Sequence, residues 1–188
     1  MCSSDLVLSR TGYTGELGFE IYGNDESILA IWDKLFDTQE LQVLPVGLGA
    51  RDTLRMEMKY TLYGMDIDRG TTPIEAGLHW ITKFDKGAFI GRESLMDENI
   101  EYKKRLVCFE MMERAVPRHN YDIFVNEKQI GMVTSGTQSP SLNKGIGLGY
   151  VEIEYANPGT KIDIDIRGRK KSAIIMKPPL YKQGTVNL

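Results

Sequence analysis

The sequence predicts an α+β protein in which a mixed region of strands and helices is followed by a small antiparallel β-barrel. The first hundred residues alternate short strand signals with the apolar spacing of amphipathic helices. After residue 105, nearly every signal is a short strand bounded by turn residues. The polar run of residues 96–104, MDENIEYKK, separates the two regions, so we expect a domain boundary near residue 102.

The first elements are two strands around a glycine-rich turn. Residues 7–9 and 18–22 have strand character, and Gly12, Gly15 and Gly18 between them permit the positive φ angles of a tight turn. These residues therefore predict a short hairpin-like unit.

Two helices are expected next. Asn24 or Asp25 can cap the first helix. Its apolar residues have the spacing of a single buried helical face, and they are Ile28, Ile31, Trp32, Leu35 and Phe36. Pro45 suits the first turn of a second helix, which runs through Met58 and ends near residues 63–64.

Mixed signals follow between residues 66 and 91. Residues 71–73, Thr-Thr-Pro, can open a short helix over residues 74–78, and residues 79–83 can form a strand. A further helix is expected to start at residues 91–95.

The C-terminal region contains six short strand-like runs separated by turn clusters. Residues 162–166, IDIDI, alternate with a clean period of two. Closure into a barrel or sandwich would protect strand edges that otherwise pair with other chains. The predicted strands are residues 105–110, 121–125, 129–135, 147–153, 161–166 and 171–176.

Composition argues against several classes of protein and site. The 23 basic and 26 acidic residues give a net charge of −3 and are mixed along the chain, so no field gathers nucleic acid. The basic cluster at residues 167–171 is best explained as a solvated hairpin tip. Two cysteines and two histidines predict neither a disulfide framework nor a metal site. The absence of a disulfide framework predicts a reducing, cytoplasmic setting. No apolar run has membrane-spanning length, so no membrane partner is expected.

Two sequence blocks carry a family resemblance. They are SRTGYTGELGFEIY at residues 9–22 and GLGARDTLRMEMKYTLYG at residues 47–64, and TTPIEAGLHW, FIGRESL and GMVTSGTQSPSLNKGIGLGYV follow in order. Together they resemble the T-protein of the glycine cleavage system, a folate-dependent aminomethyltransferase, from about Val7 onward. Departures from the family pattern are Leu17, Lys59 and Met65.

The resemblance implies a domain organisation. Residues 7–101 would be the C-terminal part of a folate-binding aminomethyltransferase domain of α/β type, and residues 102–188 the C-terminal β-barrel domain. Residues 1–6, MCSSDL, correspond to the translated end of a sequencing adapter, so we expect them to be a non-native scar. The family's N-terminal half, with its catalytic aspartate, would then be missing, which predicts no catalytic residue and little activity in this chain alone.

The resemblance also implies a reaction and partners. T-protein-like enzymes take the aminomethyl group carried on the lipoyl arm of a carrier protein, the H protein. They release ammonia and pass the one-carbon unit to tetrahydrofolate, which becomes 5,10-methylenetetrahydrofolate. Tetrahydrofolate is thus the expected co-substrate, and no metal is expected.

Glu20 is the first candidate binding residue. Strand alternation places Glu20 on the face of Tyr22 and opposite Phe19 and Ile21, and this alone favours an outward, solvated carboxylate. The resemblance implies instead that Glu20 grips the pterin ring of folate. A carboxylate is a bidentate acceptor that suits the two parallel donors of the pterin edge.

Arg51 and Tyr13 complete the candidate site. The resemblance places Arg51 at the folate site, where its guanidinium would bind carbonyl or carboxylate groups. The alternative is a surface ion pair with a neighbour, but adjacent residues do not face each other on a helix, and Arg55 at i+4 would repel Arg51. Tyr13 is either a wall of the folate pocket or a core residue.

Two other functions are compatible with a folate-binding fold. A folate-binding protein of iron–sulphur cluster assembly would need a cysteine thiol where this chain has Ala88, in KGAFIGR at residues 86–92. The folate domain of a sarcosine- or dimethylglycine-oxidising enzyme would carry a flavin domain upstream, and that alternative stays open.

Overall fold

The computed structural model of this chain describes residues 6–38, 41–97 and 101–187. All of the expected scar except Leu6 lies outside these ranges, as do residues 98–100 of the expected linker. The chain divides into two compact units, which are described separately below. Residues 1–55 with 182–188 form the first unit, and residues 56–181 form the second.

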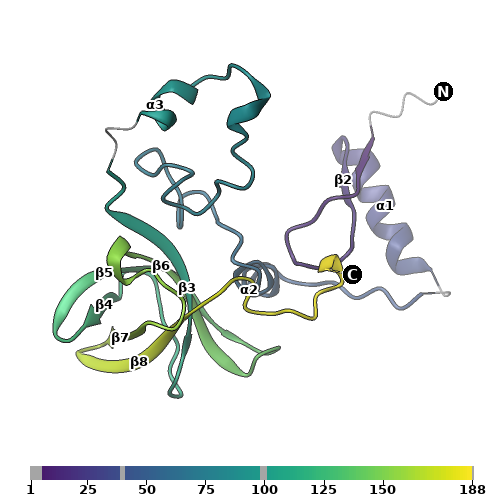
Figure 1. The fold of residues 1–188 in the computed structure, drawn as a ribbon. Helices are drawn as coiled ribbons and strands as arrows, with labels where there is room; N and C mark the ends of the chain where they lie inside the picture. The colour runs from purple at the N-terminus through teal and green to yellow at the C-terminus, as the bar shows by residue number, and fades with distance from the viewer. Residues whose placement is uncertain (1–5, 39–40, 98–100, 188) are drawn as a thin grey trace. The chain divides into compact units, whose positions relative to one another are not determined.

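The first unit contains the expected strand pair and helix (Figure 1). Strands β1 (Val7–Ser9) and β2 (Glu20–Tyr22) pair antiparallel, with Ser9 opposite Glu20. Helix α1 spans Asp25–Asp37, and the Asn24 side chain accepts a hydrogen bond of 2.9 Å from the Ser27 amide. This contact satisfies one of the free donors at the helix start and confirms the predicted N-cap.

The apolar face of α1 is not buried in the described part of this unit. Trp32 is 54% exposed, and Leu35 and Phe36 are also exposed. The predicted spacing is correct, but the predicted burial is wrong. A helix buries its apolar stripe only where another layer of structure covers that stripe. Trp32 and Phe36 instead pack on each other, with ring centroids 4.7 Å apart.

Helix α2 spans Leu48–Glu57, so Pro45 precedes the helix and does not lie in its first turn as predicted. The start is set by Gly47, whose carbonyl accepts from the amides of Ala50 and Arg51. The chain leaves the helix through Lys59, which has a φ of 60° and donates its amide to the Met56 carbonyl at 2.9 Å. This left-handed residue ends the helix earlier than predicted.

The segment between α2 and the barrel is mostly turns. Thr72 and Glu75 exchange hydrogen bonds as in a capping box, but residues 73–77 form turns without a regular helix. The strand predicted at residues 79–83 is wrong, because the amides of Ile81 and Thr82 bond back to Leu78 and form local turns. The 3-10 helix η1 (Phe84–Lys86) and the predicted helix, α3 (Arg92–Met96), follow.

All six predicted C-terminal strands are present, and they close into an antiparallel barrel with the order β3-β6-β5-β4-β7-β8 (Figure 1). The 3-10 helix η2 (Ile153–Tyr155) follows β6, and η3 (Thr185–Asn187) lies near the end of the chain. The strands are β3 (Lys104–Met111), β4 (Asp122–Val125), β5 (Lys128–Ser139), β6 (Lys144–Glu152), β7 (Lys161–Ile166) and β8 (Arg169–Met176).

The barrel encloses the main hydrophobic core. Phe109, Ile123, Val133 and Ile164 are fully buried there. Gly147 faces Phe109 across the strand pair, and a Cβ atom at Gly147 would lie 2.4 Å from the Phe109 ring. The aromatic side chain therefore occupies space that only glycine leaves free.

Cys108 is a small buried residue. It is buried in β3 beside this core, and burial raises the pKa of its thiol to about 12. The thiol is thus held in its neutral form at physiological pH.

No helix of the described residues is long and apolar enough to cross a membrane.

Candidate folate site

Glu20 lies where the glycine-rich loop closes. The pairing of Ser9 with Glu20 forms the base of the loop, and Glu20 is half-buried there. The Thr11 hydroxyl donates a hydrogen bond to Oε2 of Glu20 and lies 3.0 Å from the Ser9 hydroxyl. A hydrogen bond to the same carboxylate raises the pKa of Tyr22, whose side chain shares the Glu20 face as strand alternation predicts. These hydrogen bonds therefore fix the orientation of the Glu20 carboxylate.

Arg51 contacts Tyr13 within the same unit. The guanidinium carbon of Arg51 lies 4.6 Å from the centroid of the Tyr13 ring, at cation–π distance. Arg51 comes from the first turns of α2 and is exposed, whereas Tyr13 comes from the glycine-rich loop and is half-buried. The contact joins the two sequence blocks at residues 9–22 and 47–64.

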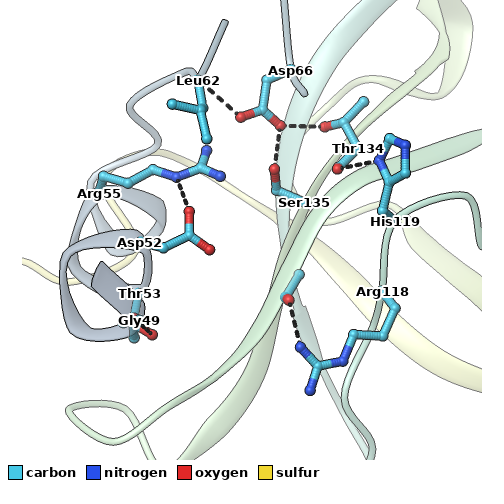
Figure 2. Close-up of polar contacts among 11 residues, drawn as sticks. Gly49, Asp52, Thr53, Arg55, Leu62, Asp66, Arg118, His119, Thr134 and Ser135 are labelled. Carbon is cyan, nitrogen blue, oxygen red and sulfur yellow. Dashed lines mark hydrogen bonds and ion pairs between the residues drawn. The ribbon is translucent and has the colours of Figure 1, made fainter. Parts of the chain in front are cut away.

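The ion pair considered as the alternative for Arg51 is made by a different arginine. Nε of Arg55 lies 2.7 Å from Oδ1 of Asp52 (Figure 2), and the Arg55 side chain is 1% exposed. Asp52 thus serves Arg55 at i,i+3 spacing, the separation at which helical side chains meet. Asp52, the acidic neighbour of Arg51, therefore already forms an ion pair with Arg55.

Of the three predicted site residues, Tyr13 and Arg51 are in direct contact, and Glu20 has its own partners at the base of the same loop. Tyr13 lies in the loop between β1 and β2, and Glu20 is the first residue of β2, directly after that loop. Such a site offers an oriented carboxylate together with a cation stacked on an aromatic ring. Both suit a flat heterocycle with hydrogen-bond donors and an anionic tail.

Comparison with known proteins identifies the family. Residues 1–86 match the GCVT N-terminal domain, and residues 104–182 match the glycine cleavage T-protein C-terminal barrel domain. The chain is 52% identical over 182 residues to an aminomethyltransferase of Bacteroides thetaiotaomicron, covering 95% of this chain and 50% of that protein. The chain belongs to the glycine cleavage T-protein family. The resemblance carried by the two sequence blocks is thereby confirmed.

Other members of the T-protein family show the same pattern of coverage. An aminomethyltransferase of Halothermothrix orenii is 47% identical over 178 residues, covering 94% of this chain and 50% of that protein. The crystal structure of the glycine cleavage system aminomethyltransferase T from Bartonella henselae matches with a TM-score of 0.87 and 34% identity, covering 96% of this chain and 51% of that one. The chain thus spans about half the length of the curated relatives it matches.

Sequence reasoning missed several polar contacts in this T-protein family chain. In the second unit, the Asp66 carboxylate accepts hydrogen bonds from the hydroxyls of Thr134 and Ser135 and from the Leu62 amide (Figure 2). In the first unit, Glu16 accepts from Thr185, 169 positions away. No local sequence pattern predicts these hydrogen-bonded pairs, because the partners come together only after folding.

Metal binding has no structural support in the part of the chain that the structure describes. No group of three or more histidine, cysteine, aspartate or glutamate side chains there could hold an ion.

Proposed function

We propose that this chain is part of an aminomethyltransferase of the glycine cleavage system. In this reaction the aminomethyl group on the lipoyl arm of the carrier H protein loses ammonia, and its one-carbon unit passes to tetrahydrofolate as 5,10-methylenetetrahydrofolate. The observation that carries the proposal is the 52% identity to an aminomethyltransferase over 95% of this chain. The lipoylated H protein is the proposed partner, and tetrahydrofolate the proposed co-substrate.

Glu20 fits the role of pterin acceptor. An ionised carboxylate offers about four lone-pair positions. Thr11 and Tyr22 each engage the Glu20 carboxylate. Positions remain for a ring N–H and an exocyclic amine, which lie parallel on the pterin edge. The two protein contacts would restrict the carboxylate before ligand arrives, which reduces the entropy lost on binding.

Arg51 and Tyr13 fit the role of a second contact to folate. The Arg51 guanidinium lies over the Tyr13 ring, and a guanidinium carries five N–H donors. Those donors suit the carbonyl and carboxylate groups of folate. In this proposal Glu20, Arg51 and Tyr13 bind and orient the co-substrate, and none of them performs the chemical step.

Folate binding tests the proposal directly. Titration calorimetry of the 188-residue chain with tetrahydrofolate under anaerobic conditions would compare the unaltered chain with Glu20→Ala. Loss of a charge-assisted bidentate contact is expected to cost about 2 to 4 kcal/mol, or roughly 30- to 800-fold in affinity. The matched control is Glu26→Gln, which removes a carboxylate from the exposed first turn of α1.

The assignment of Glu20 to the pterin requires that Glu20→Ala and Glu26→Gln differ in their affinity for tetrahydrofolate. Unchanged affinity in Glu20→Ala would remove Glu20 from the pterin role, and an equal loss in Glu26→Gln would point to net charge. Transfer itself is testable by joining the chain to the half of the Bacteroides thetaiotaomicron relative that it does not match. That chimera should form 5,10-methylenetetrahydrofolate from aminomethyl-lipoyl carrier protein, and an inactive, folded chimera would contradict the proposed reaction.

A further inference from the structure

The C-terminal tail is bound to the glycine-rich loop by a set of hydrogen bonds centred on Thr185. The amide and the hydroxyl of Thr185 both donate to Oε2 of Glu16, at 2.9 and 2.6 Å. The same hydroxyl oxygen accepts from the Leu17 amide at 2.7 Å. One threonine thus holds both a side chain and a backbone group of the loop.

Two glycines allow the tail and the loop to approach this closely. A Cβ atom at Gly184 would lie 2.5 Å from the Gly15 carbonyl oxygen, so a larger residue would force the two segments apart. Gly15 itself is buried and has a φ of 78°, which favours glycine. The Val186 amide then donates to the Gly15 carbonyl at 3.2 Å. In Figure 1 the yellow end of the chain lies against the purple loop.

These contacts fix the loop at the end opposite its base. The pairing of Ser9 with Glu20 closes the base, and the tail holds residues 15–17. Tyr13 and Glu20 therefore lie on either side of the restrained residues. A loop with three glycines has many accessible conformations, and each restraint raises the fraction that matches the bound geometry.

We propose that residues 184–186 are a positioning strap, with Thr185 as the positioning residue, which holds the glycine-rich loop in the geometry that binds reduced folate. This inference rests on the proposed function. Thr185 acts on the ligand only through Tyr13 and Glu20. Apparent affinity falls in proportion to the fraction of molecules whose loop is in the competent geometry, so loss of the strap weakens binding without removing any group from the site.

Thr185→Val and Thr185→Ser test the strap in the full chain. Valine keeps the shape of threonine and removes the hydroxyl, whereas serine keeps the hydroxyl. Calorimetry with tetrahydrofolate should show about tenfold weaker binding for Thr185→Val, the order of effect expected for one charge-assisted hydrogen bond, and near-normal binding for Thr185→Ser. Thr38→Val makes the same change at the end of α1 and should bind as the unaltered chain does.

A titration distinguishes positioning from a general loss of structure. The hydrogen bonds from the Thr185 hydroxyl and amide lower the pKa of Glu16, so the carboxyl carbon signal of Glu16 should titrate at higher pH in Thr185→Val. Thr185→Ser should leave that midpoint unchanged. A folded Thr185→Val chain with raised Glu16 pKa and weaker folate binding would support the strap.

The outcomes separate the two proposals. If Glu20→Ala weakens folate binding and Thr185→Val does not, the strap is overturned while the site assignment stands. Failure of Thr185→Ser to restore binding would also overturn the strap, because the hydroxyl would then not be the group that matters. If the unaltered chain binds no tetrahydrofolate, both the Glu20 assignment and the strap are overturned for this chain.

Discussion

Removal of the Asp66 carboxylate should strongly destabilise the second unit. Asp66 is 2% exposed and lies between α2 and the barrel strands along the chain. Its Oδ1 atom accepts from the hydroxyls of Thr134 and Ser135, the latter at 2.7 Å, and its Oδ2 atom accepts from the Leu62 amide at 3.0 Å. Asp66→Ala would take the acceptor away from all of these donors together.

The magnitude follows from the number and burial of those donors. Each lost hydrogen bond costs about 1 kcal/mol net, and more where the donor stays buried, so Asp66→Ala should lower the free energy of unfolding by about 3 kcal/mol. Asp66→Asn should cost only about 1 kcal/mol. Its carbonyl oxygen can still accept from Leu62, and the hydroxyls of Thr134 and Ser135 can rotate to accept from its amide.

Urea denaturation followed by circular dichroism measures both changes. With a slope of about 2 kcal/mol per molar urea, Asp66→Ala should shift the midpoint down by about 1.5 M and Asp66→Asn by about 0.5 M. Glu154→Gln is the control, because Glu154 is 62% exposed in its surface ion pair with Lys128 and should contribute little. A midpoint for Asp66→Ala equal to that of Glu154→Gln would refute the reasoning, as would an equal loss in Asp66→Asn.

Two further predictions concern pH dependence and domain organisation. Burial lowers the pKa of Lys59 below the ordinary lysine value of 10.5. As pH approaches 10.5, the folded chain therefore binds fewer protons at Lys59 than the unfolded chain does. Lys59 should thus make the free energy of unfolding rise with pH in that range. Unfolding curves of the unaltered chain and of Lys59→Met between pH 8 and 10.5 should therefore show a difference that changes with pH, and a constant difference would contradict it. Limited proteolysis should spare a barrel fragment that starts near residue 102, because the barrel is closed whereas apolar side chains of α1 are exposed. If residues 7–101 resisted the protease equally well, that result would count against this domain boundary.

The barrel was the most predictable part of the fold. Its strands can be predicted from local patterns: apolar and polar residues alternate along each strand, and turn residues separate the strands. In β7, for example, Ile162 and Ile164 are buried and Asp163 between them is not. The hairpin tip at Arg167 and Gly168 has positive φ at both residues, as a tight turn between antiparallel strands requires. Period and turn chemistry are properties of neighbouring residues, so the sequence alone carries them.

The predictions that were wrong concern elements whose boundaries depend on context. Pro45 was compatible with a first helical turn, yet the helix begins at Leu48 because the Gly47 carbonyl accepts the first helical bonds. Residues 79–83 had strand composition, but the amides of Ile81 and Thr82 bond within local turns. In both places propensity allowed two outcomes, and the hydrogen bonds available in the folded chain decided between them.

The candidate site shows the same division. The residues Tyr13, Glu20 and Arg51 were named from motifs, and the contact between Tyr13 and Arg51 agrees with a shared site without testing their roles. Neither Thr11 as a partner of Glu20 nor Thr185 as a partner of Glu16 could be named from sequence. A single threonine has no periodicity or motif that points to its partner.

By itself, the sequence determined the family, the barrel and the residues of the candidate site, because motifs and alternation are encoded in residues close together along the chain. Only the tertiary structure decided how those residues are held. It orients the Glu20 carboxylate through Thr11 and Tyr22, stacks Arg51 on Tyr13, and brings Thr185 to Glu16 across 169 positions. Hydrogen bonds between distant residues form only when packing brings donor and acceptor to within about 3 Å, and no local pattern records that distance.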